Sequence, residues 1–502
     1  MALRALCNIS ARPHCLRSTT AAYYSTPSIS LPLSESQKKT IYALSTPKGK
    51  GGVGVIRISG PQSLDAWRSV VKSGRQDPEP WKMNRCKIVH PLRKDDVLDD
   101  GMAVFFKGPK SFTSEDVLEL HIHSGRAITS SVLDALSSIP GLRHAEAGEF
   151  TKRAFKSGRI DLTQAEGIKD MIEAETDAQR RIAVGAAMGI SRVKFTELRD
   201  EIIGCLALIE ALIDFGEGED IEEGVYDQAR TRAQTLLTTI EGHLSDRRRG
   251  ELLRSGVRLA IFGPPNAGKS TLLNFLAQRE AAIVTPIPGT TRDILELSLD
   301  IGGIPVLVGD TAGVRETEDL VEEIGVERAK KAVQAADISL CVLPLPEIRP
   351  HSKDIRLGLA PEIQELIDEK TVFLFNKADL VSGASQNTHS TTGTEWQVSL
   401  STGQGCKAFL SGFEKILQER FDLSFDSTGQ DRNPPLITHS RHRVHLQSAA
   451  DFLRVFLDYG SQDVVLGAEE LRYAAQAVGR ISGTVDVEDV LDVVFREFCI
   501  GK

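Results

Sequence analysis

The sequence predicts an α/β protein of several domains, in which a domain with a mainly parallel sheet interrupts an all-α helical domain and an α+β domain precedes both. Three observations support this. Strands and helices alternate between about residues 257 and 400, helical periodicity dominates on either side of that stretch, and β-rich sequence occupies residues 40–125. A chain of 502 residues is also too long for one core and is expected to form roughly two to four domains.

Composition limits the classes of function. Apolar residues make up 41 % and charged residues 26 % of the chain, which is ordinary for a globular protein, and no apolar run reaches the roughly 20 residues that cross a bilayer. With a net charge of −9, the chain is not expected to bind nucleic acid by charge alone, so action on RNA would need a local basic patch or a partner. Seven cysteines without CxxC or metal-ligand spacing indicate free thiols in a reducing compartment.

The first 34 residues differ from the rest of the chain. They contain Arg4, Arg12 and Arg17, many Ser, Thr and Ala, and no acidic residue before Glu35. This composition is typical of a mitochondrial or chloroplast transit peptide, although a disordered tail without function would look similar. No continuous apolar segment of a secretion signal is present. Residues 1–35 are therefore set apart from the fold prediction.

The N-terminal region up to about residue 155 reads as an α+β domain. Residues 40–58 form a strand, a glycine loop and a second strand whose apolar residues alternate, and VLELHIHSG at 117–125 reads as a further strand. From about residue 162 to 253, long stretches carry apolar residues at helical spacing. The acidic segment 214–223 is interpreted as a solvated turn between helices, and the basic run 247–249 as a helix end rather than an RNA patch.

An α/β region begins at VRLAIFG (257–263), and after about Gly412 the helical pattern returns and continues to the last residue. The α/β region therefore looks like an insertion into one helical domain. It opens with GPPNAGKS (263–270), which follows a predicted strand and precedes a predicted helix, as a phosphate-binding loop requires. Gly263 and Gly268 allow the backbone N–H groups to point at phosphates, the ammonium of Lys269 reaches the β- and γ-phosphates, and the hydroxyl of Ser270 is a magnesium ligand.

Four further motifs follow in the order that a GTPase needs. PGTTRD (288–293) supplies Thr291 for magnesium and the γ-phosphate, and DTAG (310–313) supplies Asp310 behind the metal and the amide of Gly313. NKAD (376–379) can read the base, because the carboxylate of Asp379 accepts hydrogen bonds that guanine donates and adenine lacks. VSLS (398–401) fits the last base-contacting loop. The full set predicted to bind GTP is Asn266, Ala267, Gly268, Lys269, Ser270, Thr271, Thr285, Gly289, Thr290, Thr291, Asp310, Thr311, Ala312, Gly313, Asn376, Lys377, Asp379, Ser399, Leu400 and Ser401.

The hydrolytic machinery is less conventional. Where Ras-type enzymes have a glutamine after DTAG, this chain has Val314, which can neither donate nor accept a hydrogen bond. A carboxylate of the following loop, VRETEDLVEEIG, can replace the glutamine. No arginine finger is identifiable in this segment, so another cation must offset the transition-state charge. Asn266 either holds a monovalent ion beside the phosphates or only caps the loop.

At this point the sequence resembles the MnmE (TrmE) family of tRNA-modification GTPases, in its mitochondrial form. The resemblance rests on the GTPase motifs and on PKGKGGVGVIRISGP (47–61), SEDVLELHIHSG (114–125), AGEFTKRAFKSGRIDLTQAEGI (147–168) and the terminal FCIGK (498–502). It implies a transit peptide at 1–35, a folate-binding and dimerising domain at 36–157, a helical domain at 158–253 and 416–502, and an inserted Ras-like domain at 254–415.

The resemblance also implies a function. With an FAD-containing partner of the MnmG (GidA) family, a homodimer in the mitochondrial matrix would hydrolyse GTP and act on mitochondrial tRNA. It would add a carboxymethylaminomethyl- or taurinomethyl-type group to C5 of the wobble uridine, with a tetrahydrofolate derivative as one-carbon donor. An alternative of another class is a GTP switch that assists mitochondrial ribosome assembly, which would have no use for a folate pocket or the terminal FCIGK.

The resemblance adds further residue roles. Asn266, Thr285, Ile287 and Thr290 match the potassium site, and Glu322 matches the carboxylate that orients water. Ser270 and Thr291 keep the magnesium site that the motifs already indicate, and Lys269 is also counted as catalytic. Arg57, Glu119, Arg159 and Lys502 match folate contacts, with Arg57 and Lys502 assigned to the glutamate tail and Glu119 to the pterin. Cys499 is either a nucleophile or a small buried apolar residue. Arg159 stands where bacterial members have lysine, and HIHSG where they have HGG.

Overall fold

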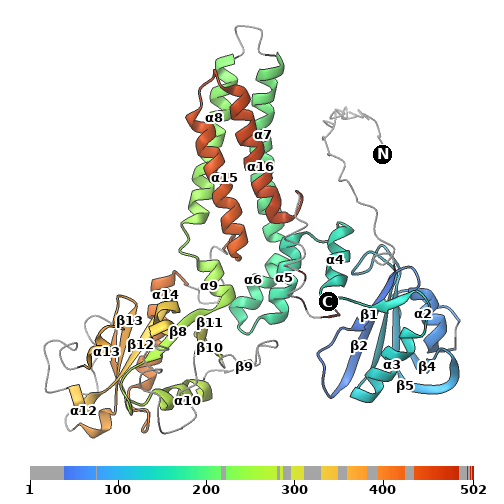
Figure 1. Cartoon of the computed structure of the whole chain (residues 1–502), viewed down its shortest axis with the longest axis horizontal. Coiled ribbons are helices and arrows are strands. Elements are labelled where there is room, and N and C mark those ends of the chain that lie inside the picture. Colours follow the sequence, from blue (N-terminus) through green and yellow to red (C-terminus); the bar gives the residue numbers. More distant parts are fainter. Residues whose placement is uncertain are drawn as a thin grey trace, which may run out of the picture. The chain divides into compact units, whose positions relative to one another are not determined.

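The computed structural model describes residues 39–74, 76–215, 222–279, 283–285, 296–309, 330–348, 359–381, 394–423, 435–485, 495, 498 and 500–501 (Figure 1). The expected transit peptide, 1–35, lies outside these ranges. The chain divides into two compact units, one of residues 1–106 and 116–144 and one of residues 107–115 and 145–502.

The first unit is built on a mixed sheet. Its described strands are β1 (Thr40–Leu44), β2 (Gly51–Ser59), β3 (Val71–Lys72), β4 (Asn84–His90), β5 (Arg93–Phe106), β6 (Val117–Ser124) and β7 (Leu142–His144), in the order β3-β4-β5-β6-β2-β1-β7. Neighbours are antiparallel except β1 and β7. The strands predicted at 40–58 and 117–125 are confirmed, although β2 already begins at Gly51, inside the expected glycine loop.

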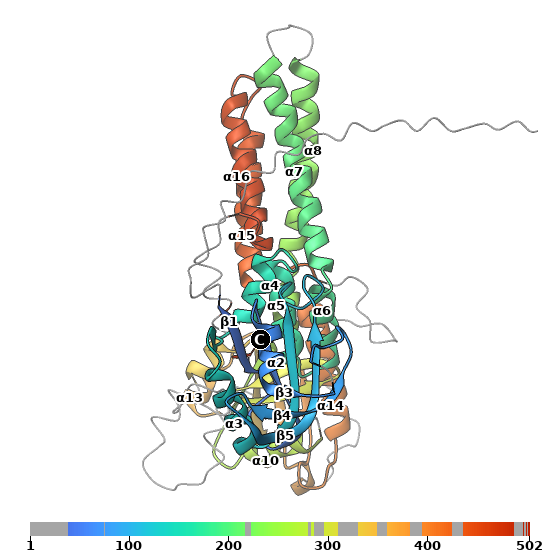
Figure 2. The same ribbon diagram turned by 90° about the vertical axis from the view of Figure 1, so that its right-hand side faces the viewer.

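Two helices, α2 (Ser63–Val70) and α3 (Arg126–Ser137), complete the core of this unit. Alternate residues of β2 and β6 point into that core, where Trp67 of α2 and Leu136 of α3 are fully buried. The intervening residues of the same strands, which include Arg57 and Glu119, therefore lie on the opposite face of the sheet. Figure 2 shows the strands of this unit side by side with both helices.

The second unit begins with three helices, α4 (Glu149–Lys156), α5 (Leu162–Glu173) and α6 (Asp177–Ala187). Asp161 and Thr176 start α5 and α6 as capping boxes, because each side chain accepts from the backbone N–H of a glutamine three residues later, which reaches back in turn. Four long helices follow: α7 (Ile190–Phe215), α8 (Glu222–Leu244), α15 (Ser440–Asp458) and α16 (Val464–Ser482).

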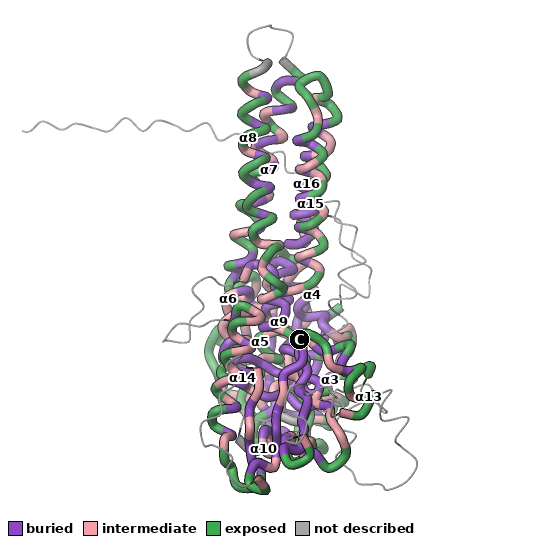
Figure 3. The backbone as a smooth tube through the Cα atoms, turned by 90° about the vertical axis from the view of Figure 1, so that its left-hand side faces the viewer, coloured by how far each residue is buried: buried purple, intermediate pink, exposed green. Residues whose placement is uncertain are grey.

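These four helices form a bundle with one apolar core, although α8 and α15 are separated by the whole α/β region (Figures 1 and 3). Ile202 and Ile209 of α7 pack in that core with Leu453 of α15 and Leu471 of α16, all fully buried. The discontinuous helical domain predicted from the sequence is thereby confirmed. The expected acidic turn, 214–223, lies mostly outside the described residues.

The inserted domain contains the second sheet. Its described strands are β8 (Val257–Phe262), β9 (Ile283–Thr285), β10 (Glu296–Ile301), β11 (Ile304–Val308), β12 (Ile338–Pro344), β13 (Thr371–Asn376) and β14 (Glu395–Gln397), in the order β14-β13-β12-β8-β11-β10-β9. The strands from β14 to β11 are parallel, whereas β10 is antiparallel to both of its neighbours. The mainly parallel sheet expected from the alternation of strands and helices is confirmed.

Helices lie on both faces of this sheet, where α10 (Lys269–Arg279) and α14 (Cys406–Phe421) pack into one apolar cluster and α12 (Leu345–Ile348) into another. Short α13 (Pro361–Gln364) adds Ile363 to the second cluster. The expected boundary at 415/416 falls inside α14, whose Phe409, Phe413 and Leu417 all belong to the core of the inserted domain.

A short helix, α9 (Arg249–Ser255), connects α8 to β8. Its Leu252 and Leu253 pack into the core of the inserted domain. The helix end expected at 247–249 is confirmed as the N-terminal end of α9, where the guanidinium of Arg248 pairs with Glu251 at 2.8 Å. Among the described residues, no helix combines the length and apolar character needed to cross a membrane.

The packing of α9 yields a test of the junction between the two domains. A Cβ added at Gly250 would lie 2.1 Å from the carbonyl oxygen of Ile437, a backbone atom that cannot move aside cheaply, whereas a Cβ at Gly242 of α8 would meet nothing within 4 Å. We expect Gly250→Ala to destabilise the protein by about 1–3 kcal/mol through overpacking, and Gly242→Ala to stabilise it by about 0.5–1 kcal/mol. The two variants should shift the midpoint of thermal unfolding in opposite directions; equal midpoints would contradict the packing described for α9.

Candidate functional site

The loop between β8 and α10 has the backbone of a phosphate cradle. Gly263 and Gly268 adopt φ values of +146° and +100°, which only glycine adopts readily. A Cβ at Gly263 would lie 2.1 Å from the carbonyl oxygen of Val342, and one at Gly268 would lie 2.2 Å from Nδ2 of Asn376. Both glycines are therefore required by conformation and by close packing, and the loop leads directly into the N-terminus of α10 at Lys269.

Lys269 and Ser270 take the places that the motif assigns to them. The ammonium of Lys269 donates to the carbonyl oxygens of Gly263 at 2.9 Å and Pro264 at 2.8 Å, so it is held within its own loop. Burial lowers the pKa of Lys269 below its ordinary value. Ser270, the second residue of α10, is exposed, which leaves its hydroxyl accessible to a metal ion.

Asn266 sits on this loop with φ of +60°, a left-handed conformation that asparagine tolerates better than most residues. Its side chain is exposed and makes no hydrogen bond with any residue that the structure describes. The turn of the loop is closed instead by the backbone, since the N–H of Ala267 donates to the carbonyl of Pro264 at 3.4 Å. Capping by the Asn266 side chain is therefore not observed here, and its amide oxygen is available to a ligand.

The base-binding end is organised by Asn376, the last residue of β13. Its side chain is 5 % exposed, its Nδ2 donates to the carbonyl of Ala267 at 2.9 Å, and its Oδ1 accepts from the N–H of Leu400 at 3.2 Å. One amide thus joins the phosphate loop, NKAD and the VSLS loop. The NKAD motif predicts only a base-reading role for Asn376, because no local sequence pattern shows that the three loops converge.

The other described residues of the NKAD and VSLS loops lie near Asn376. Lys377 adopts φ of +63°, and the 3₁₀ turn η4 (Ala378–Leu380) carries Asp379, which is exposed and able to receive a base. The N–H of Ala378 donates to the carbonyl of Val398 at 3.0 Å, and the hydroxyls of Ser399 and Ser401 lie 3.0 Å apart. Motifs more than 100 residues apart in the chain therefore meet at one edge of the sheet, as the sequence analysis predicts.

Much of the predicted catalytic half lies outside the described residues. Of Thr285 the structure describes only the backbone, at the end of β9. The other predicted positions outside the described ranges are Ile287, Gly289, Thr290, Thr291, Asp310, Thr311, Ala312, Gly313, Val314, Glu322, Cys499 and Lys502. Their assigned roles in magnesium, potassium, water and folate binding stay predictions.

The polar face of the first sheet brings two predicted folate contacts together. Arg57 of β2 and Glu119 of β6 are register partners, and Nε of Arg57 donates to Oε1 of Glu119 at 2.8 Å. Burial works to raise the pKa of Glu119, but its contacts with His121 and Arg57 outweigh burial and lower that pKa below its ordinary value. The carboxylate is therefore ionised at neutral pH.

Arg57 and Glu119 are in direct contact, so a ligand that reaches one side chain also reaches the other. The expected division between them, with Arg57 at the glutamate tail of folate and Glu119 at the pterin, stays a prediction. Beside them, Nε2 of His121 is buried, has no hydrogen-bond partner among the described residues, and lies 3.7 Å from Oε2 of Glu119, beyond hydrogen-bond distance. An unsatisfied buried nitrogen next to an ionised carboxylate fits a ligand with several hydrogen-bonding groups, such as a pterin ring.

The other predicted folate contacts belong to the second unit. Arg159 is exposed in the turn after α4, where its N–H donates to the carbonyl of Ala154 at 3.1 Å. The C-terminal motif is fixed beside the same helix: Ile500 forms an antiparallel bridge with Ala147, and Phe498 packs with Leu162 of α5. Phe498 and Ile500 therefore belong to the α4–α5 region.

The fold and this site define a class. A mainly parallel sheet with helices on both faces, a glycine cradle between β8 and α10, and the NKAD and VSLS loops at the ends of β13 and β14 together make the inserted domain a P-loop GTPase domain.

Comparison with known proteins supplies the family. Residues 40–159 match the N-terminus of GTP-binding protein TrmE, and residues 162–499 match the MnmE helical domain. The chain is 45 % identical over 474 residues to the mitochondrial 5-taurinomethyluridine-[tRNA] synthase subunit GTPB3 of Danio rerio, covering 92 % of this chain and 93 % of that protein. It is 41 % identical over 466 residues to the tRNA modification GTPase MnmE of Rickettsia bellii, covering 92 % and 100 %. The mitochondrial tRNA modification GTPase gtpbp3 of Dictyostelium discoideum is 38 % identical over 496 residues, covering 93 % and 95 %. The chain belongs to the MnmE (TrmE) family of GTPases.

The exposed Asp379 allows a direct test of base recognition. In Asp379→Asn the acceptor for the N1–H and 2-amino groups of guanine is lost, so we expect GTP affinity to fall by about 1–3 kcal/mol, or roughly 5- to 150-fold. Xanthosine triphosphate, which carries an oxygen in place of the 2-amino group, should bind the variant better than it binds the wild type. Fluorescent-nucleotide titration measures both affinities; an unchanged preference for GTP would remove Asp379 from the base site.

Proposed function

We propose that this protein is a mitochondrial GTPase of tRNA wobble-uridine modification. Membership of the MnmE family supports this, as do the functions for which its relatives are named, two of which are mitochondrial proteins. The acid-free, arginine-containing N-terminal sequence is consistent with import into mitochondria. The observation that carries the proposal is the presence, in one chain, of a GTPase site and a separate polar sheet face with an ionised carboxylate and an unsatisfied histidine.

A simple GTP switch has no need of that second face. Arg57, Glu119 and His121 suit a heterocycle with alternating donors and acceptors, and we assign them to the pterin of a tetrahydrofolate derivative. Arg159 and Lys502 are left as contacts for the anionic tail. When bound, the folate would supply the one-carbon unit that becomes the methylene bridge to C5 of the uridine, while an FAD-containing partner of the MnmG type would handle the redox chemistry.

The product is then a carboxymethylaminomethyl- or taurinomethyl-type uridine, and the name of the Danio rerio relative favours the taurine form. We assign the protein to a homodimer, as the family resemblance implies. The alternative of a ribosome-assembly switch is not favoured by any feature of the described residues. Cys499 is kept as a candidate nucleophile, next to the ordered bridge between Ile500 and Ala147.

For GTP hydrolysis we propose the following roles for residues of the inserted domain. Lys269 binds the β- and γ-phosphates, exchanging its two carbonyl partners for phosphate oxygens. Ser270 and Thr291 would hold magnesium, which neutralises the phosphates, and Glu322 would orient the attacking water in place of the glutamine that Val314 replaces. Asn266, whose amide is available in the structure, would hold potassium together with Thr285, Ile287 and Thr290, and the ion would supply the positive charge of an arginine finger.

Modification itself is tested in cells. Mass spectrometry of mitochondrial tRNA nucleosides, with and without the gene for this protein, should show loss of the C5-substituted wobble uridine and accumulation of unmodified uridine. Re-expression of the wild-type chain should restore the modified nucleoside. A Glu119→Gln chain should not, because the amide loses the charge that Arg57 and a pterin require. Unchanged nucleosides in the deletion strain would refute the proposed function.

The potassium assignment has its own test. GTP hydrolysis by the full-length protein should be fast in potassium chloride and at least tenfold slower in sodium chloride of equal ionic strength, because a smaller ion fits the same oxygens less well. Asn266→Ala should be slow in both salts while it still binds GDP. Equal rates of the wild type in the two salts would remove the ion from the mechanism.

A further inference from the structure

The inserted GTPase domain is joined to the helical domain by two chain segments, and both are held by acidic residues of one helix. The incoming segment is α9, and the outgoing segment is the stretch 435–439 that leads into α15. Helix α5 presents Glu166 and Asp170, one turn apart on the same face, to this junction. The two segments lie directly against each other, since a Cβ added at Gly250 would lie 2.1 Å from the carbonyl oxygen of Ile437.

Asp170 bonds to both segments at once. Its Oδ1 accepts from Nε of Arg254, in the last turn of α9, at 2.8 Å, and its Oδ2 lies 2.9 Å from Nε2 of His439, the residue that caps α15. The side chains of Asp170 and His439 are each 13 % exposed. Burial works to raise the pKa of Asp170, but the bonds to His439 and Arg254 outweigh it, so the pKa lies below its ordinary value and the carboxylate is charged.

Glu166 fixes the outgoing helix in place beside Asp170. Arg441 donates to both of its oxygens at 3.0 Å, and Nε2 of His442 lies 2.9 Å from Oε2. The same guanidinium donates to the carbonyls of Arg480 and Ile481 at the end of α16. The start of α15 is thereby locked to α5 and α16, and it forms a rigid support for the His439 contact.

On the incoming side, α9 is locked to the GTPase domain. Leu252 and Leu253 pack into its core, and the chain continues through β8 to the phosphate loop at Gly263 without an intervening loop. The carbonyl of Arg254 also accepts from Nε2 of Gln179 at 2.9 Å, and that glutamine belongs to the capping box of α6. The bond between Arg254 and Asp170 therefore lies between two well-packed bodies.

We propose that Asp170 is a positioning residue through which nucleotide-driven movement of the GTPase domain is transmitted to the helical domain. The reason is geometric: a rotation of the inserted domain must move α9 relative to the stretch 435–439, and Asp170 is bonded to both. The inference rests on the proposed function only where wobble-uridine modification is measured, because the coupling between the two domains does not depend on tRNA chemistry.

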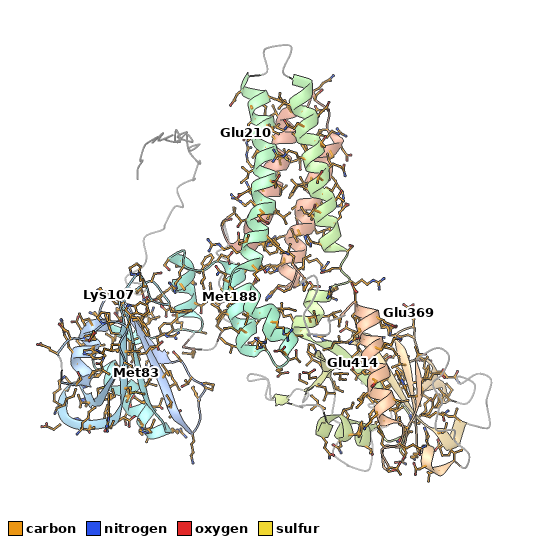
Figure 4. All side chains as sticks on the ribbon, turned by 180° about the vertical axis from the view of Figure 1, so that it is seen from behind. Met83, Lys107, Met188, Glu210, Glu369 and Glu414 are labelled. Carbon is orange, nitrogen blue, oxygen red and sulfur yellow. The ribbon has the colours of Figure 1, made fainter. Side chains whose placement is uncertain are left out.

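The test compares Asp170→Asn with Asp177→Asn in the full-length protein. Asp177 is the control, because its carboxylate pairs with two cations, Arg180 and Arg181, as that of Asp170 pairs with Arg254 and His439, but both partners of Asp177 belong to its own helix α6. Spin labels at Glu369 in the GTPase domain and Glu210 on α7, both marked in Figure 4, report the distance between the domains in GDP and in a GTP transition-state analogue. Arg254→Gln, which removes only the incoming contact, serves as a second variant.

We expect the variants to hydrolyse GTP normally but to lose the movement between the domains. In potassium, Asp170→Asn and Arg254→Gln should keep kcat for GTP within about twofold of the wild type, while the nucleotide-dependent change in label distance is lost and wobble modification falls at least tenfold. Asp177→Asn should match the wild type in every measurement. An intact distance change in Asp170→Asn would overturn the proposal, as would a parallel loss of GTPase rate, distance change and thermal midpoint, which indicates a structural role alone.

These outcomes separate the inference from the proposed function. If the wild-type protein shows the distance change but its deletion leaves tRNA nucleosides unaltered, the proposed function fails and the coupling role of Asp170 stands. If modification depends on the protein but Asp170→Asn supports it fully, the coupling role fails and the proposed function stands.

Discussion

The structure of the second unit depends on one constraint: a domain inserted into another leaves and returns through the same place. Helices α7 and α8 pack against α15 and α16 although the GTPase domain separates them in the chain. The first and last residues of that domain must therefore lie close together. The junction achieves this with charged groups rather than with a large apolar contact, since Glu166 and Asp170 gather Arg441, His442, His439 and Arg254 around α5. Buried ion pairs of this kind add little net stability but penalise any arrangement that leaves a charge unpaired. They are suited to fixing the geometry of two connections.

Inside the GTPase domain, the side chain of Asn376 connects the phosphate loop to the base-binding loops. By bonding to Ala267 and Leu400 it makes the position of the phosphate loop depend on the base-binding loops. A Cβ at Gly268 would strike the same amide, so the glycine of the phosphate motif is required by this connection as well as by its own backbone angle. Phosphate and base recognition are therefore features of one packed assembly of three loops.

The sequence predicted most of this architecture because the relevant signals are local. Alternating apolar residues located β2 and β6, helical spacing located the bundle, and the strand–glycine loop–helix order located β8 and α10. The limits of the inserted domain, 254–415, stay a prediction, and no local pattern shows that Leu252 and Leu253 of α9 and Leu417 of α14 pack into the GTPase core. Similarly, motif matching named Arg57 and Glu119 but could not show that they are register partners, since register across β2 and β6 depends on long-range pairing. The motif at 147–168 includes Glu166 and ends just before Asp170, but it does not show that either carboxylate contacts the junction.

The arginines described here are paired within the chain, which bears on how the protein would bind tRNA. The arginines at the junction do not form an RNA patch, because Arg254, Arg441 and Arg443 each bind carboxylates. The same holds near α4, where Arg153 pairs with Glu115 and Glu149. With a net charge of −9, a chain that commits these guanidinium groups internally has less cationic surface with which to neutralise a phosphate backbone. Under the proposed function, tRNA affinity would then come largely from the FAD-containing partner, and the contribution of this chain would be the GTP-driven movement and the folate-bound carbon.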